Sequence, residues 1–300
     1  MRTQIASLFQ KSVEWPTFIA IGGCYAVWLS ATWFQFPGWW LAAILATGFF
    51  ASLQHEVLHG HPTRSRWINE ALVFPALAPL YPFRRFRDMH LKHHNNPKLT
   101  DPYDDPESLY VAEHDWEKAN PLTRAVLRIC RPLLGRMIVG PWAGFWVFLR
   151  HDIAQIRAGN RKIARQWLPH FPAVALVMAW LIAVDVGLLF WGLCIVWPAA
   201  ALMSVRTYIE HRAAEAPEHR SAIIEDRGFF ALLFLNNNLH ALHHEQPALP
   251  WYRLPALYRN DPVLWQRRNG GYVLSGYGAV FRRHLLRGRE PIVHPLMRKK

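Results

Sequence analysis

The segment Asn236-Asn-Asn-Leu-His240-Ala-Leu-His243-His244-Glu-Gln-Pro247 contains three histidines at positions i, i+3 and i+4. These positions share one face of a helix, so the three imidazoles point to one place. The same spacing occurs in His90-Leu-Lys-His93-His94, and His55-Glu-Val-Leu-His59 places two more histidines one helical turn apart. Three such clusters in one chain predict that the histidines meet. Eight imidazoles are too many for one metal ion, so the pattern predicts two ions.

The chain combines a large apolar fraction with a strong positive charge. Of its 300 residues, 52% are apolar, and the formal net charge is +13. No Lys or Arg occurs between Lys11 and Arg64, or between Arg165 and Arg206. Each gap can hold two helices of about 20 residues, the length that a bilayer core requires. The sequence therefore predicts four membrane-spanning helices.

The predicted fold class is all-α: an integral membrane protein whose four helices form two hairpins, with a cytoplasmic helical cap that carries the histidines. Lys and Arg favour the cytoplasmic side, and the turns at 35–38 and 184–187 contain neither. We therefore expect both termini and all three clusters on the cytoplasmic side, at the inner membrane if the organism is bacterial. The expected single domain covers residues 1–300, with spans at about 15–34, 38–54, 168–184 and 187–205 and cytoplasmic parts at 55–167 and 206–300.

His211 follows the fourth predicted span much as His55 follows the second, which makes it a candidate ninth ligand. His61 follows His59 by only two residues, so it points away from the ligand face. We expect His61 either to support the site from outside the ligand set or to be exposed.

Metal-ligating histidines usually donate their second ring nitrogen to an acceptor. Asp101, Asp104 and Asp105 lie in a loop rich in Pro and Asp after the second cluster, and each is a candidate acceptor. An ordinary solvated turn would have the same composition. Asn237, three residues before His240, could also join the metal-facing surface.

Imidazole suits iron, zinc, copper and nickel. The three cysteines have no paired spacing, so the ligand set is histidine alone, which favours two Fe²⁺ ions over a structural zinc. Two ferrous ions can together reduce O2 and attack an unactivated C–H bond, chemistry that no side chain supplies. Because the clusters follow predicted spans, the expected substrate is a lipid or acyl chain that arrives from the bilayer.

The three clusters resemble the three histidine boxes of the integral-membrane fatty acid desaturase superfamily in order, spacing and position, over roughly residues 15–250. The resemblance implies a non-haem di-iron centre, O2 as co-substrate and two electrons from a redox partner. Members often carry a further histidine after the fourth span, which His211 fits. The ligands then expected are His55, His59, His90, His93, His94, His211, His240, His243 and His244.

The histidine boxes do not distinguish among the reactions of this superfamily. We expect desaturation of a lipid acyl chain, with hydroxylation or ketolation of an acyl chain or carotenoid as the alternative. The sequence contains neither a cytochrome b5 domain nor a four-cysteine redox motif, so a separate electron donor, ferredoxin-like or similar, with its reductase is expected. The basic stretches suit such an acidic donor or anionic lipid, and they do not predict a nucleic-acid partner.

Two other interpretations remain. His55-Glu56-Val-Leu-His59 also matches the H-E-x-x-H motif of zinc peptidases, in which the glutamate is the general base. That interpretation leaves the histidines of the other two clusters without a role. A metal transporter would need polar residues along its spans, and the predicted spans contain almost none.

Overall fold

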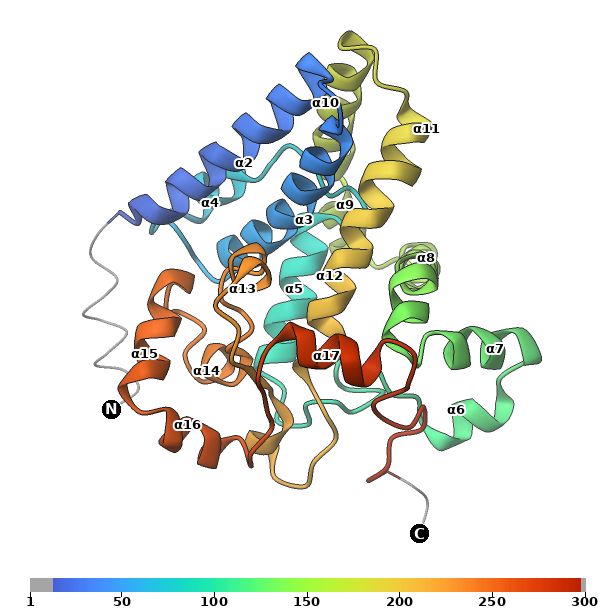
Figure 1. The fold of residues 1–300 in the computed structure, drawn as a ribbon. Coiled ribbons are helices and arrows are strands. Elements are labelled where there is room, and N and C mark those ends of the chain that lie inside the picture. The colour runs from blue at the N-terminus through green and yellow to red at the C-terminus, as the bar shows by residue number, and fades with distance from the viewer. Residues whose placement is uncertain (1–12, 298–300) are drawn as a thin grey trace. The chain divides into compact units, whose positions relative to one another are not determined.

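The computed structural model describes residues 13–297, which are mostly helical (Figure 1). These residues fall into two compact units. Unit 1 contains residues 13–87, 145–200 and 248–252. Unit 2 contains residues 88–144, 201–247 and 253–297. That the two units act as a single membrane-embedded domain stays a prediction.

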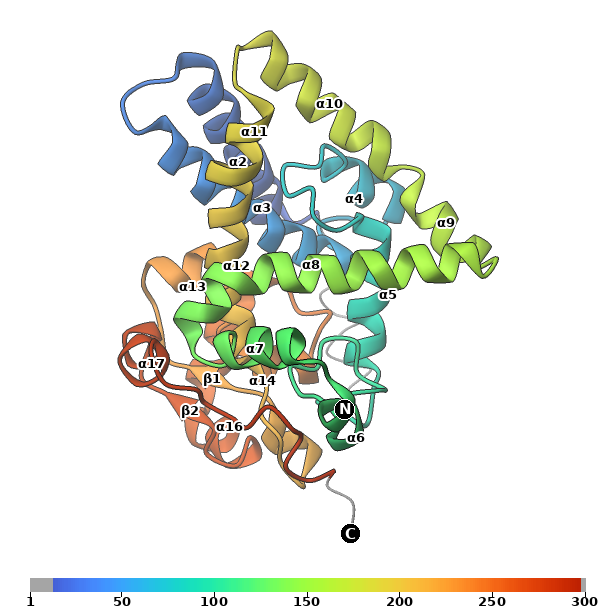
Figure 2. The same ribbon diagram turned by 90° about the vertical axis from the view of Figure 1, so that its right-hand side faces the viewer.

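Unit 1 begins with two long apolar helices, α2 (Trp15–Phe34) and α3 (Trp39–Leu58). Pro16 lies in the first turn of α2, where no backbone N–H is needed. Gln35 and Gly38 both adopt the left-handed conformation, which ends one helix and starts the next. The two helices pack side by side (Figures 1 and 2).

One face of α2 is buried and the other is covered with exposed apolar side chains. Cys24 and Trp28 are buried, whereas Ile19 and Trp33 are exposed. Such a surface is stable against lipid but not against water. Within residues 13–297, four helical stretches are long and apolar enough to cross a bilayer: 15–34, 39–58, 161–183 and 188–210. Four candidate spans were predicted; their pairing into hairpins and their orientation stay predictions.

The span boundaries differ in part from the expected ones. α3 continues through His55 to Leu58, because the first helix breaker after it is Gly60, whose φ is 102°. The third stretch starts earlier, with α9 (Arg161–Trp167), and continues into α10 (His170–Ala183). The fourth consists of α11 (Leu188–Phe190), the π-helix η1 (Trp191–Val196) and α12 (Trp197–Glu210).

The helix that carries the second histidine cluster is α5 (Phe83–His94), which starts in unit 1 after the short helix α4 (Arg66–Leu72). Arg85 contacts both carboxylate oxygens of Asp152, each at 2.7 Å; Asp152 belongs to α8 (Leu133–Arg157). Asp152 is fully buried and also accepts the indole N–H of Trp167 at 2.8 Å. A buried carboxylate is stable only with such a set of donors, and this set fixes the start of α5.

Unit 2 consists of short helices around one small pair of strands. β1 (Ile223–Ile224) and β2 (Val273–Leu274) pair in parallel (Figure 2), a minor exception to the all-α prediction. The Ala241 N–H donates at 3.0 Å to the carbonyl of Ala222, the residue just before β1. This bond holds α14 (His240–Glu245), which carries the third cluster, next to the start of the strand. The remaining elements of unit 2 are α6 (Glu113–Lys118), α7 (Pro121–Ile129), η2 (Pro217–Arg220), α13 (Phe229–Leu233), α15 (Leu254–Asn260), α16 (Pro262–Arg268) and α17 (Tyr277–His284). The short helix η3 (Trp251–Arg253) begins in unit 1.

Candidate metal centre

Four imidazoles of unit 2 converge at one place. They are His93 at the end of α5, His211 directly after α12, and His240 and His244 on α14, and their ligand atoms all lie within 4.8 Å of one another. His211 Nε2 is 3.0 Å from His93 Nε2 and 2.9 Å from His240 Nε2. His244 Nε2 is 3.1 Å from His240 Nε2. Helical spacing brings the two α14 residues together, whereas only the fold adds His93 and His211.

The second ring nitrogen of His93 contacts a carboxylate. His93 Nδ1 is 2.7 Å from Asp105 Oδ1. An ionised carboxylate can only accept a hydrogen bond, so Nδ1 carries a proton, and in the neutral imidazole that binds a metal Nε2 keeps its lone pair. Asp105 is held in place by the Thr100 N–H at 2.7 Å and the Glu107 N–H at 2.9 Å.

His240 is oriented in the same way through an amide. Asn237 Nδ2 donates to Glu210 Oε1 at 2.9 Å, which leaves Asn237 Oδ1 facing His240 Nδ1 at 3.1 Å. Glu210 also pairs with Arg206 at 3.0 Å. Because Glu210 accepts, the amide must donate to it and accept from His240, so His240 Nε2 also keeps its lone pair. Ser221 Oγ lies 3.3 Å from His211 Nδ1.

These nitrogens fit a metal ion better than a hydrogen-bond network. The lone pairs of His93 and His240 both face His211 Nε2, and one imidazole nitrogen holds either one proton or one lone pair. Metal–imidazole bonds of about 2.1 Å place neighbouring ligands of an octahedral ion about 3 Å apart. The observed separations match that edge length, so the four residues can hold one divalent ion.

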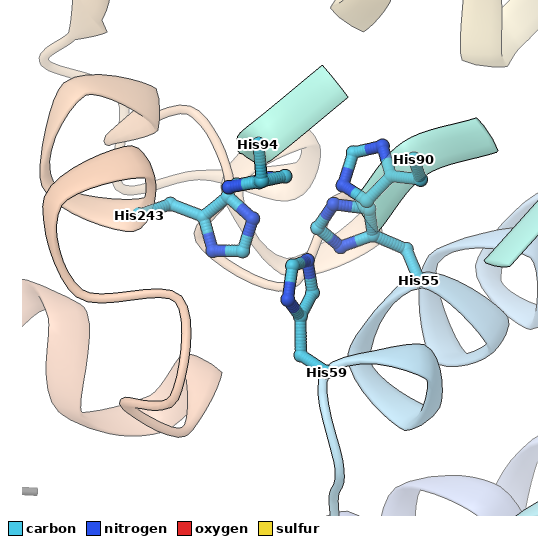
Figure 3. A group of neighbouring side chains, drawn as sticks. All are labelled: His55, His59, His90, His94 and His243. Atoms are coloured by element: carbon cyan, nitrogen blue, oxygen red, sulfur yellow. The ribbon is translucent and has the colours of Figure 1, made fainter. Parts of the chain in front are cut away.

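A second group of three histidines adjoins the first within unit 2. The ligand atoms of His90, His94 and His243 also lie within 4.8 Å of one another (Figure 3). His90 Nδ1 is 2.7 Å from Glu107 Oε1, so His90 Nε2 keeps its lone pair. The ring of His94 stacks on that of His244 with 4.0 Å between centroids. Unit 2 therefore brings seven imidazoles together in two neighbouring groups.

The electrostatics of unit 2 favour neutral imidazoles at three of the ligand candidates and a charged Glu107, whereas the carboxylates beside His93 outweigh burial and raise the pKa of His93. Burial, reinforced by the neighbouring histidines, lowers the pKa of His211, His240 and His244 well below the ordinary value. Burial opposes charge on Glu107, but His90 and His93 outweigh it and hold the pKa of Glu107 below its usual range. Neutral imidazoles beside an ionised carboxylate are the protonation states that a metal ion requires.

The first cluster lies in unit 1, at the end of α3. His55 and His59 are one turn apart, their ring centroids are 5.0 Å apart, and Figure 3 shows both rings on one side of the helix. Helical spacing predicted this pair, and the pair is present.

Glu56 and His61 form a separate network in unit 1. His61 Nδ1 is 2.7 Å from Glu14 Oε1, and His61 Nε2 is 3.8 Å from Glu56 Oε1. Glu56 also accepts the Trp251 backbone N–H at 3.0 Å. Although burial opposes a charge on His61, Glu56 and Glu14 raise its pKa. A glutamate held in this way is poorly placed to act as the general base of a peptidase.

The candidate acceptors named from the sequence differ in their contacts. Asp105 and Asn237 contact ligand candidates. Asp101 accepts the N–H groups of Tyr103 and Asp104, and so shapes its own loop. Asp104 pairs with exposed Lys98 at 2.7 Å, and no contact joins it to a histidine among residues 13–297.

Sequence reasoning missed Glu107 and Ser221, which contact His90 and His211. Glu210, which pairs with Arg206, is linked to His240 through Asn237, and no sequence signal indicated that link. Glu107 stands in the same Asp- and Pro-rich loop as Asp105, and that shared loop was the only available signal.

Comparisons with known proteins agree with this geometry. The model of a family described as fatty acid desaturase matches residues 12–275. The chain is 26% identical to an sn-1 oleoyl-lipid 12-desaturase from a Picosynechococcus species, over 82% of this chain and 74% of that protein. It is 24% identical to the chloroplastic omega-6 fatty acid desaturase of Brassica napus, over 84% of this chain and 60% of that protein. It is 26% identical to the chloroplastic omega-6 fatty acid desaturase of Arabidopsis thaliana, over 78% of this chain and 54% of that protein. The chain thus matches less than two thirds of the plant relatives' length.

Proposed function

Because the chain belongs to the fatty acid desaturase family, we propose that it is a membrane-bound oxidoreductase that uses O2 to introduce a double bond into an acyl chain of a lipid. The observation that carries the proposal is the group of His93, His211, His240 and His244, whose nitrogens have the spacing of ligands on one ion. The four apolar helices support a place in the membrane, where a lipid substrate can reach the site from the bilayer.

We assign nine histidines as ligands of two iron ions. His93, His211, His240 and His244 hold one ion. His90, His94 and His243 hold the other, and we propose that His55 and His59 complete that set, a step that rests on the histidine-box pattern. Imidazole-only donors suit iron, and the family makes iron the expected metal. When bound, a di-iron pair supplies the reduction of O2 and the removal of hydrogen from an unactivated C–H bond.

The side chains around the ligands keep them ready for metal. Asp105, Glu107 and Asn237 each hold the Nδ1 proton of a ligand histidine, so that Nε2 remains available. The overall reaction consumes O2, two electrons and two protons, removes one hydrogen from each of two adjacent carbons, and releases two waters. The electrons come from a separate donor with its reductase. Exposed arginines on α16 and α17, such as Arg267, Arg268 and Arg282, would suit an acidic donor.

We further propose that the chain is multi-pass, with both termini and the histidines on the cytoplasmic side. The absence of Lys and Arg from the turns at 35–38 and 184–187 supports this orientation. Cysteines introduced at the exposed positions Phe36 or Asp185 should be labelled by an impermeant reagent from outside intact cells. A cysteine at His114 should be labelled only after the membrane is permeabilised. The reverse pattern would contradict the topology.

Lipid profiling by mass spectrometry tests the reaction. Cells that express the chain should accumulate lipids lacking two hydrogens relative to cells that express a His240→Ala variant. A product heavier by one oxygen atom would instead assign hydroxylation, and an added oxygen with loss of two hydrogens would assign ketolation. If no desaturated, hydroxylated or ketolated product formed with a donor system present, the proposed oxidoreductase function would be rejected.

Metal analysis provides an independent test. The purified protein should contain about two irons per chain, as expected from the number of imidazole ligands. His93→Ala and His90→Ala should each lose about one equivalent, because the two residues belong to different groups. Protein that retains only zinc and consumes no O2 with reductant would contradict the di-iron assignment.

A further inference from the structure

The C-terminal residues 291–297 pack against the loop that carries Asp105 and Glu107, within unit 2. Val111 N–H donates to the Ile292 carbonyl at 2.9 Å, and His294 N–H donates to the Val111 carbonyl at 3.0 Å. These two bonds form a parallel bridge between Val111 and Val293. The match to the family model ends at residue 275, before this segment.

The side chain of His294 points into this loop. His294 is 5% exposed, and its Nε2 lies 3.2 Å from Thr100 Oγ1. The Leu296 N–H donates to His294 Nδ1 at 3.3 Å, so Nδ1 carries no proton. Burial and nearby Arg220 lower the pKa of His294, which keeps the ring neutral. The tautomer is therefore fixed, and Nε2–H donates to the Thr100 hydroxyl.

Thr100 adopts a backbone conformation that needs support. Its φ is 74°, in the left-handed region that a β-branched residue rarely occupies, and it is 2% exposed. Such a conformation is unfavourable and persists only where the surroundings of the residue determine it. Ser108 Oγ donates to the Thr100 carbonyl at 2.7 Å, and His294 donates to its hydroxyl.

The strained residue is joined directly to the metal centre. In its left-handed conformation, Thr100 donates its N–H to Asp105 Oδ2 at 2.7 Å, and Asp105 Oδ1 holds His93 Nδ1 at 2.7 Å. We propose that His294 is a positioning residue for the metal centre: it holds Thr100 in the left-handed conformation, and Thr100 thereby fixes Asp105 against His93. The C-terminal segment is then part of the site, although it contributes no ligand.

This inference deepens the proposed function and rests on it only where metal binding is concerned. The ordering of the loop by His294 is a property of the metal-free protein and can be measured without metal. The two parts can therefore fail separately.

The experiment compares His294→Ala with His294→Gln, whose side-chain N–H can still reach the Thr100 hydroxyl. Thr100→Val removes the hydroxyl but keeps the β-branched shape, and Thr100→Ser keeps the hydroxyl. His114→Ala is the matched control, because His114 is exposed on α6 of the same unit. Hydrogen exchange of the Thr100 and Glu107 amides is measured in metal-free protein in detergent. Co²⁺ and Fe²⁺ titrations then give metal affinity.

We expect His294→Ala and Thr100→Val each to speed exchange of these two amides about tenfold, and to weaken one of two metal equivalents by on the order of tenfold. The double variant should be no worse than the worse single one, because both remove the same bond. His294→Gln, Thr100→Ser and His114→Ala should stay near wild type. Unchanged exchange in His294→Ala would overturn the proposal, as would an equal effect in His114→Ala. Faster exchange in a protein whose wild type binds no iron would keep the ordering role and reject the di-iron function instead.

Discussion

Two histidines of this chain have the same kind of partner and different surroundings. His61 in unit 1 and His93 in unit 2 each place Nδ1 2.7 Å from a carboxylate oxygen, and in both the carboxylates raise the pKa against the effect of burial. The second nitrogen distinguishes them. His93 Nε2 faces His211 Nε2 at 3.0 Å, whereas His61 Nε2 faces Glu56 at 3.8 Å. A carboxylate–imidazole pair therefore identifies a metal ligand only when the second ring nitrogen faces other imidazoles. A histidine such as His61, whose second nitrogen faces another carboxylate, is here called an anchor, because it holds the surrounding structure together without binding metal.

Replacing Asp105 should produce the largest effect on the ligand side of this comparison. Asp105→Ala removes the acceptor of His93 Nδ1 and of two loop N–H groups in a buried place. Loss of such a partner typically weakens metal binding about 10- to 100-fold, and we expect that loss for one of two equivalents. Metal titration with Co²⁺ or Fe²⁺ measures it. Asp105→Asn, which can still accept from His93, should lose less. If both variants bound metal as tightly as the wild type, the contact between Asp105 and His93 would not orient the ligand.

Removing His61 should destabilise the protein and leave its metal content intact. His61→Ala leaves Glu14 and Glu56 in a buried network without their imidazole, a change that typically costs about 3–5 kcal/mol. Thermal unfolding in detergent should register the loss, and metal analysis of the folded fraction should still find about two irons per chain. His93→Ala is the matched variant, because it should lose metal. If His61→Ala lost an equivalent as His93→Ala does, the second ring nitrogen would not separate anchor from ligand.

Substitutions of Glu56, which faces the anchor His61, should have a smaller effect on stability. Glu56→Gln keeps an oxygen that can accept the Trp251 N–H, whereas Glu56→Ala removes this acceptor at a cost of about 1–3 kcal/mol. The amide variant should therefore retain most lipid-modifying activity and stability, and the alanine variant should lose stability. Activity assays and thermal unfolding on both variants decide the matter. A peptidase general base predicts instead that the two variants are equally inactive.

Local periodicity predicted much of this molecule because the features concerned are local. Charge-free stretches predicted four apolar helices, and i, i+3, i+4 spacing predicted which imidazoles share a face. The contact between His93 and His211 joins residues 118 positions apart, and no spacing rule encodes it. The repetition of the clusters predicted that they meet, and the position of His211 after the fourth span made it a candidate ligand; the resemblance to desaturases agreed with both. It could not supply His294, which meets Thr100 from 194 positions away.

The sequence also could not predict which carboxylate accepts a hydrogen bond from a ligand histidine. Asp101, Asp104 and Asp105 are chemically alike and share one loop, so the sequence could name them only as a set. The fold of the loop selects Asp105 as the acceptor of His93, because the left-handed Thr100 donates its N–H to Asp105. Asp101 caps the turn and Asp104 points to solvent. Which carboxylate becomes an acceptor thus depends on one backbone dihedral that composition does not reveal.

Substitution of Asp104 should have the smallest effect on metal affinity, and it is the matched control for substitution of Asp105. The Asp104 carboxylate is half exposed and pairs with Lys98, which lowers the pKa of Asp104 through their hydrogen bond. Exposed ion pairs contribute little, so Asp104→Asn should leave metal affinity and loop hydrogen exchange within about twofold of wild type. The substitution lies one residue from Asp105 and makes the same chemical change as Asp105→Asn. A difference between the two variants therefore measures contact with His93 rather than loop charge. Equal losses would mean that the summed charge of the loop supports the histidines, and that no single carboxylate orients His93.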